Sequence, residues 1–167
     1  YYYKGDIIDS NFPIKSFTQK LIPYGAHNGY QYLWHTGEGN SGDSASSITF
    51  LKGDRFYSLT TTANSATQFD FVMTGSNDPD MDLLTQKGII FSAPQADNHV
   101  FLAVLEPHGK IDYSAETTSN TTSNVKKLQL ISSDNNQTIF TLTTAKNKYR
   151  FIIHPNDKNN FLTIKKI

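Results

Sequence analysis

Gln68-Phe69-Asp70-Phe71 and Lys127-Leu128-Gln129-Leu130 alternate polar and apolar side chains, and Ile139-Phe140-Thr141-Leu142 continues this period of two. Alternation places every second side chain on one face of a sheet, which is typical of a half-buried β-strand. Val100-Phe101-Leu102-Ala103-Val104-Leu105 is apolar throughout, so we expect a central strand that is covered on both faces. β-Branched and aromatic content predicts further strands at residues 29–36, 47–51, 55–61, 88–91, 149–153 and 161–167.

Clusters of Gly, Asn, Asp, Ser and Pro separate these stretches, and such residues favour turns. We expect an Asx turn at Asn77-Asp78-Pro79-Asp80 and an exposed loop from Ser114 to Asn124. No stretch predicts a helix longer than a turn or two, and no internal repeat or second domain is evident. The sequence therefore predicts an all-β fold: an antiparallel β-sandwich of many short strands with little or no helix, forming one domain over residues 1–167.

The composition of the chain limits the classes of function. Its 167 residues are 37 % hydrophobic and 13 % aromatic, which is enough for a folded core. Fifteen basic and fifteen acidic residues cancel, so we expect no long-range attraction to nucleic acid or to an anionic membrane, and an acidic polysaccharide would be held by local groups. The absence of cysteine excludes disulfides, and no apolar stretch approaches the roughly 20 residues that cross a bilayer. We interpret the opening Tyr1-Tyr2-Tyr3 as a cut in a longer chain.

An aromatic segment is the first candidate for ligand binding. Trp34 is the only tryptophan, and a strand at residues 29–36 would place Tyr30, Tyr32 and Trp34 on one face. An exposed row of rings forms a flat platform for stacking sugars. The same rings can instead fill the space between two sheets, because aromatic side chains on strands are usually buried.

Glu106-Pro107-His108-Gly109 is the second candidate, because a carboxylate and an imidazole two residues apart can serve acid/base chemistry in a cleft. The competing interpretation is structural: Glu106 accepts backbone N–H bonds and His108 holds a turn. His35 is the other histidine that lies beside polar residues of a motif. The five histidines form no i, i+2 or i, i+4 pair, and the oxygen-rich run from Asn77 to Asp82 lacks the glycine and glutamate of an EF-hand loop. We therefore predict no metal site and no cofactor in this chain.

Four segments in order resemble the C-terminal region of the heparinase II/III-like polysaccharide lyases, most closely the oligoalginate lyases of polysaccharide lyase family 17. The segments are Tyr24-Gly25-Ala26-His27-Asn28-Gly29-Tyr30-Gln31-Tyr32-Leu33-Trp34, Gly53-Asp54-Arg55-Phe56-Tyr57-Ser58-Leu59-Thr60, Gly75-Ser76-Asn77-Asp78-Pro79 and Val104-Leu105-Glu106-Pro107-His108-Gly109. From Val125 onward the chain is similar only as generic β-sheet. Relatives also follow Asn-Asp-Pro with an asparagine-leucine-arginine run, where this chain has Asp82-Leu83-Leu84-Thr85.

The resemblance implies a lyase that cleaves uronic-acid glycans by β-elimination, with an N-terminal catalytic domain outside this chain and a periplasmic or secreted location. It implies no catalytic residue here. The candidate substrate-binding residues are Tyr30, Tyr32, Trp34, Arg55, Glu106 and His108. The expected partners are the catalytic domain, against which the β-domain would pack with an exposed apolar or aromatic face, and an acidic polysaccharide. The alternatives are a free-standing carbohydrate-binding module and a chain that is itself catalytic through His108, Glu106 or Tyr57.

Overall fold

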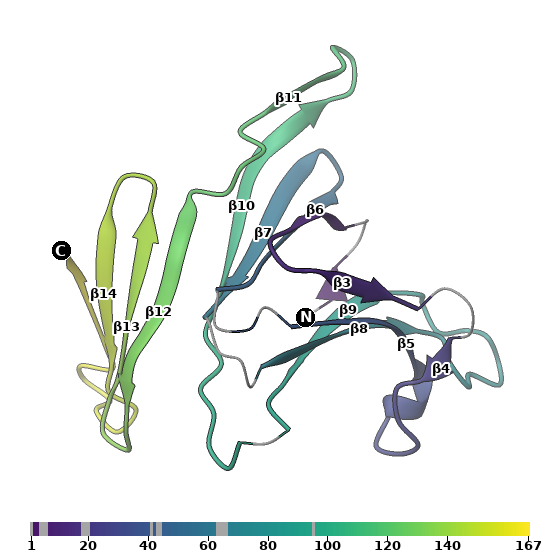
Figure 1. Ribbon diagram of the computed structural model, residues 1–167, viewed down its shortest axis with the longest axis horizontal. Helices are drawn as coiled ribbons and strands as arrows, with labels where there is room; N and C mark the ends of the chain where they lie inside the picture. Colours follow the sequence, from purple (N-terminus) through teal and green to yellow (C-terminus); the bar gives the residue numbers. More distant parts are fainter. Residues whose placement is uncertain are drawn as a thin grey trace.

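The computed structural model describes residues 2–3, 7–17, 21–40, 42, 45–62, 67–94 and 96–167, and the first residue of the aromatic opening, Tyr1, lies outside this set. In the described residues the strands are antiparallel and form three sheets, with a single 3₁₀ turn, η1 (Tyr30–Tyr32), and no α-helix (Figure 1). The all-β, sandwich-like fold predicted from the sequence is confirmed.

The first two sheets face each other and form the sandwich. The first runs in the order β1 (Tyr2–Tyr3), β9 (Lys87–Ser92), β8 (Gln68–Thr74), β5 (Leu33–Gly39) and β3 (Ile14–Ser16), and β4 (Ile22–Pro23) also pairs with β5. The second runs β11 (Thr117–Ser119), β10 (Ala103–Asp112), β7 (Arg55–Thr61), β6 (Ser47–Lys52) and β2 (Ile7–Ser10). The buried cluster between them consists of Phe12, Ile48, Leu59, Phe69, Phe71 and Ile89.

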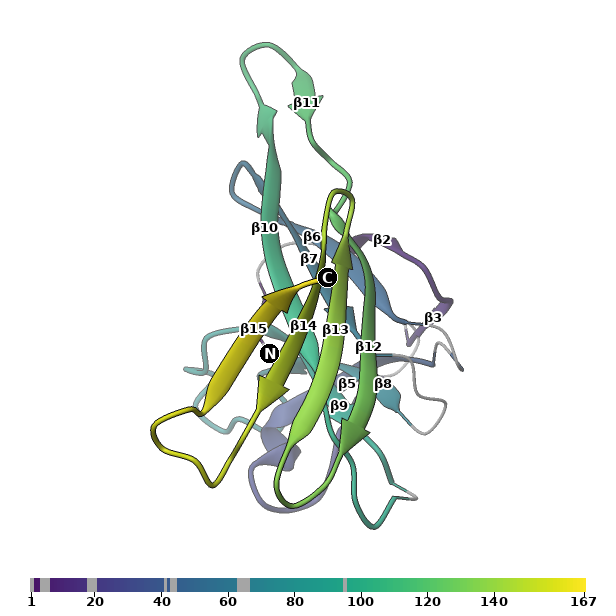
Figure 2. The ribbon, with the colours of Figure 1, turned by 90° about the vertical axis from the view of Figure 1, so that its left-hand side faces the viewer.

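A third sheet contains β12 (Val125–Ser133), β13 (Thr138–Thr144), β14 (Lys148–Ile153) and β15 (Leu162–Lys166), in that order. It lies on the far side of the second sheet from the first sheet, with β12 against β7 and β10 (Figures 1 and 2). Leu128 on β12 is 1 % exposed, which identifies the face of the third sheet that turns inward. The molecule therefore has three layers, and the second sheet is the middle one.

Two strands differ from their predictions in how many of their faces are covered. The alternating strand β8 is buried on both faces: Phe69 and Phe71 belong to the core, and Asp70 and Val72, on the opposite face, are covered as well. The prediction that residues 100–105 form a central strand covered on both faces is wrong. Strand β10 begins only at Ala103, and Phe101 and Leu105 are 49 % and 40 % exposed. Exposed and less exposed side chains alternate along residues 103–108, so one face of β10 is open, and this half of the strand is also an edge because β11 pairs only at residues 110–112.

The turn predictions divide in a similar way. The Asp78 carboxylate accepts hydrogen bonds from the backbone N–H groups of Asp80 and Leu83, which confirms the Asx turn. The segment from Ser114 to Asn124 is exposed in most of its length but is more than a loop, because it contains β11 and forms a hairpin with β10 (Figure 2).

Candidate functional site

The aromatic segment does not form the predicted row on a strand. Strand β5 begins at Leu33, and Tyr30 and Tyr32 belong to the 3₁₀ turn η1 instead. Asn28 and Gly29 both have positive φ angles, 60° and 87°, which turn the backbone away from an extended path. Tyr30 and Tyr32 are 46 % and 40 % exposed, whereas Trp34 is half-buried on β5 opposite Met73 and Pro23. A platform of three rings on one strand face is therefore absent, and an exposed pair of tyrosines remains.

A polar cluster that sequence reasoning missed contacts Tyr30 through the ring of Tyr24. The buried carboxylate of Asp70 on β8 accepts hydrogen bonds from the Tyr24 hydroxyl at 2.8 Å and the Gln68 amide at 2.9 Å. His35 on β5 places its Nε2 atom 3.3 Å from Asp70 Oδ1 and packs edge-on against the Tyr24 ring. The signal in the sequence is the aspartate itself, because a charge between Phe69 and Phe71 on a strand needs partners when it is buried.

Tyr24 and Asp70 act as a donor and an acceptor held in one arrangement. Burial of the phenol, together with its hydrogen bond to Asp70 and the negative charge of that carboxylate, raises the pKa of Tyr24 well above its usual range. Tyr24 therefore stays protonated at neutral pH and donates its hydroxyl proton to Asp70. The cluster ties the turn that carries Tyr30 to the first sheet, since the Tyr24 ring also contacts the Tyr30 ring at 5.4 Å between centroids.

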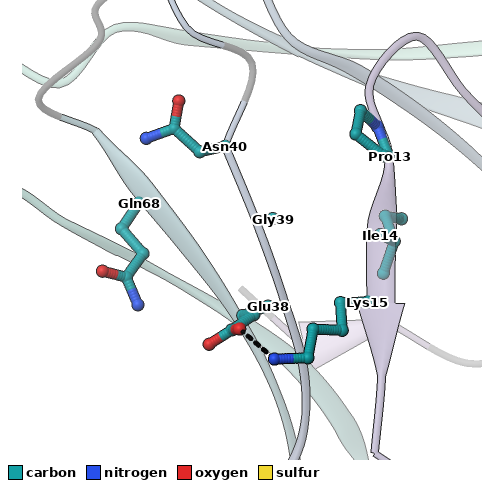
Figure 3. A pocket seen from close by; sticks show the side chains of 7 residues that line it. All are labelled: Pro13, Ile14, Lys15, Glu38, Gly39, Asn40 and Gln68. Carbon is teal, nitrogen blue, oxygen red and sulfur yellow. Dashed lines mark hydrogen bonds and ion pairs between the residues drawn. The ribbon is translucent and has the colours of Figure 1, made fainter.

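A groove of about 420 Å³ opens beside this cluster, over the edge of the first sheet (Figure 3). Its lining is Pro13, Ile14, Lys15, Glu38, Gly39, Asn40 and Gln68. Lys15 and Glu38 face each other across β3 and β5 and form an ion pair at 3.1 Å, which Figure 3 shows inside the groove. The groove thus presents one paired cation and one paired anion, and Gln68 connects it to Asp70.

The second predicted site lies on the other side of the molecule, on β10. His108 is buried: its Nε2 is 2.8 Å from Ser58 Oγ, and its Nδ1 is 2.8 Å from the carbonyl oxygen of Asn120. Because a carbonyl only accepts, Nδ1 carries the proton in that bond. Ser58 is itself within 2.6 Å of Thr49 Oγ1. Both ring nitrogens of His108 therefore have protein partners, and the residue is buried.

Glu106 holds the chain just beyond β11. Its carboxylate accepts bonds from the Ser123 hydroxyl, from the backbone N–H groups of Asn124 and Val125, and from the Asn124 side chain. Partial burial opposes ionisation, but these hydrogen bonds outweigh it and lower the pKa of Glu106. Gly109, at φ 46°, lets the backbone of Ser119 and Asn120 approach closely. Glu106, His108 and Gly109 thus form a clamp on residues 119–125, which we call the β10 clamp.

Arg55 is exposed at the start of β7, where it pairs in register with Lys52 and Lys110. The structure brings Glu106 and His108 onto one strand but places them in the second sheet, apart from Tyr30, Tyr32 and Trp34 in the first-sheet layer (Figure 1). The six predicted substrate-binding residues therefore do not converge on one site. Among the described residues no group of three or more His, Asp or Glu side chains is placed to hold a metal ion, and no helix is long and apolar enough to span a membrane.

The fold defines an all-β, sandwich-like domain, and comparison with known proteins assigns its relatives. The chain is 38 % identical over 134 residues to an exo-oligoalginate lyase of Saccharophagus degradans, and this match covers 78 % of the chain and 18 % of the relative. It is 27 % identical over 127 residues to an alginate lyase of Stenotrophomonas maltophilia, covering 76 % of this chain and 17 % of the relative. No protein-family model matches. The predicted resemblance to oligoalginate lyases is confirmed, and the chain spans less than a fifth of the length of these relatives.

Proposed function

We propose that this chain is a β-sheet domain of a heparinase II/III-like polysaccharide lyase that cleaves alginate-type glycans by β-elimination, and that its own role is structural. The observation that carries the proposal is the similarity of about three quarters of the chain to a small part of two alginate lyases. The catalytic groups would then belong to another domain of the same protein. A periplasmic or secreted location is part of the proposal.

The contacts of the acid/base side chains support a structural role. Glu106 and His108 direct their polar atoms at residues 120–125 and at Ser58, and Asp70 directs its carboxylate at Tyr24 and Gln68. A general acid or base must instead reach the proton that it transfers on the substrate. In this arrangement the same groups hold strands and turns together.

Exposed apolar side chains support a packing partner at the end of the first sheet. Met81, Leu83 and Leu84 are 91 %, 41 % and 74 % exposed on the loop between β8 and β9. This loop lies beside η1, because the N–H groups at its start, at Gly75 and Ser76, both donate to the carbonyl of Tyr32. Apolar surface of this kind is typical of interfaces. The catalytic domain would pack against this loop and the two exposed tyrosines. The groove, which lies toward the opposite ends of β5 and β8, would form one wall of the substrate cleft.

The test compares the chain with the product of its complete reading frame on oligoalginate, following the ultraviolet absorbance of the unsaturated product. We expect a longer frame whose product is active, and a 167-residue chain that gives no product. Within the longer protein, Leu84→Asp should lower activity or loosen the two domains toward proteolysis, whereas a substitution of the exposed Tyr113 to Asp should not. Product formation by the chain alone would refute the proposal.

A carbohydrate-binding role is the second candidate, and the exposure of Tyr30 and Tyr32 favours it. Its test is binding of alginate oligosaccharides to the chain and to Tyr30→Ala and Tyr32→Ala. Tyr113→Ala is the matched control, since Tyr113 is 64 % exposed on the β10–β11 hairpin. A loss of affinity confined to the first two variants would support this role, and equal affinity in all three would reject it.

A further inference from the structure

The charges of this neutral chain are segregated between its layers. Residues 125–167, which form the third sheet, contain eight Lys and Arg and two Asp, a formal net charge of +6. Residues 1–124 contain seven basic and thirteen acidic residues, a formal net charge of −6. Overall neutrality therefore does not describe the field near the third sheet, where a local excess of one sign attracts oppositely charged polymers.

The strand register gathers four of these cations on one face. Lys127, Thr143 and Lys148 form one cross-strand row, and Gln129, Thr141, Arg150 and Lys165 form the next. These positions alternate with Leu128, whose side chain is buried, and all of them except Thr141 and the half-buried Thr143 are exposed. The two rows therefore lie on the outer face of the sheet, away from the middle layer. Figure 2 shows the four strands of this sheet side by side in front of β10. We call this surface the basic face.

The cations of the basic face are available to a ligand. Lys127, Lys148, Arg150 and Lys165 are exposed, and in the described residues none of them takes part in an ion pair. The two acidic residues of the third sheet, Asp134 and Asp157, lie in its turns, where backbone N–H groups bond to their carboxylates. The basic face thus contains positive charge without compensating carboxylates.

We propose that the basic face binds a polyanionic polysaccharide that carries a carboxylate on its sugar units. Lys148 and Arg150 are two residues apart on one strand, roughly 7 Å, and Lys127 and Lys148 are separated by one strand, about 10 Å. This is a flat grid of cations that can follow an extended chain of carboxylates. Gln129 and Thr143 add an amide and a hydroxyl between the charges for sugar hydroxyls. The choice of a uronic-acid polymer as the ligand rests on the proposed function.

The register also argues against nucleic acid. Single-stranded nucleic acid is held by aromatic rings on which bases stack, as well as by cations. Tyr149, Phe140 and Phe151 occupy the alternate positions of β13 and β14 and belong to the face that carries Leu128. The basic face therefore offers charge and hydrogen bonds but no aromatic ring in its two rows.

The experiment is native electrophoresis of the 167-residue chain through gels that contain sodium alginate at low ionic strength. We expect retardation by alginate that is lost at high salt, no retardation by dextran, and about tenfold weaker apparent affinity for Arg150→Glu combined with Lys165→Glu. The matched control is Lys52→Glu with Lys110→Glu, which changes the net charge equally at exposed positions of the second sheet and should remain within about twofold of wild type.

A second pair, Lys127→Gln with Lys148→Gln, tests the neighbouring row without charge reversal, and circular dichroism verifies that each variant is folded. Unchanged binding in both basic-face variants, an equal loss in the control, or equally tight binding of DNA would each overturn the proposal. Binding is measured on the chain itself. A failure of the lyase assay would therefore refute the proposed function and leave the basic face as a polyanion site, whereas a failure of binding would leave the lyase assignment intact.

Discussion

Substitution of Gly109 by alanine tests whether the β10 clamp fixes the path of the chain between the second and third sheets. A Cβ atom at residue 109 would lie 2.2 Å from the carbonyl oxygen of Asn120 and 2.3 Å from that of Ser119, where real contacts exceed 3.0 Å. The backbone must move by about 1 Å to relieve this contact. That movement breaks the 2.8 Å bond from His108 Nδ1 to Asn120 O.

The magnitude follows from two contributions. A non-glycine residue at φ 46° costs about 1–2 kcal/mol, and the loss of a hydrogen bond to a buried partner costs about 1–3 kcal/mol more. We therefore expect Gly109→Ala to lower the free energy of unfolding by about 2–5 kcal/mol. Gly53→Ala is the matched control, because Gly53 has φ 65° and no atom lies within 4 Å of its Cβ position. This variant therefore loses only the free energy that the backbone conformation costs.

The assay is urea unfolding followed by far-ultraviolet circular dichroism and by the fluorescence of Trp34, which reports on the first sheet. A difference of about 1–3 kcal/mol between the two alanine variants would show that the close approach of residues 119–120 carries the effect. Equal destabilisation of Gly109→Ala and Gly53→Ala would refute the clamp, since backbone conformation alone would then account for both.

Three further predictions concern single side chains. Glu106 has a lowered pKa, so the stability that it contributes is present above its ordinary pKa of 4.5 and is lost as the pH falls through its pKa in the folded protein. The difference in urea midpoint between wild type and Glu106→Gln should therefore shrink on acidification. Tyr24 has a raised pKa, so the stability that it contributes to the fold is complete below pH 10 and is lost in stronger base. Ultraviolet titration should show one tyrosine ionising after the others, and Asp70→Asn should make this tyrosine ionise earlier. Leu128→Ala should cost about 2–5 kcal/mol of unfolding free energy in urea titrations, against under about 1 kcal/mol for the half-exposed Leu162→Ala.

Period-two patterning, together with β-branched and aromatic content, was sufficient to predict the fold class and most strands, including β7, whose predicted bounds are those of the structure. It could not predict which strands are covered on both faces, because coverage depends on neighbours that are distant in sequence. The apolar residues of β10 lie at an edge since β11 is short, and the polar Asp70 lies in the interior since Tyr24 and Gln68 satisfy it. Local conformation was also hidden at Tyr30 and Tyr32, where the positive φ angles of Asn28 and Gly29 override strand propensity.

The sequence predicted which kinds of side chain the candidate sites contain, but not how those side chains are arranged in space. The sequence raised both a catalytic and a structural interpretation for Glu106 and His108, and the contacts favour the structural one. The cluster at Asp70 combines residues from three separate segments, so no spacing in the sequence announces it. The basic face depends on register, because only the pairing of β12, β13, β14 and β15 places cations from three strands in adjacent rows.

The β10 clamp and the basic face are physically connected through residues 119–125. Glu106 bonds to Asn124 and Val125, and β12 begins at Val125, so the clamp determines where the third sheet starts. If the basic face binds a polyanion, the direction of the bound polymer relative to the sandwich depends on the bonds from Glu106 to the start of β12. Glu106→Gln should then leave the affinity for alginate at neutral pH close to that of wild type, because the cations are unchanged, while proteolysis between β11 and β12 becomes faster. A loss of affinity without faster proteolysis would mean that Glu106 acts on the ligand directly rather than through the position of the sheet.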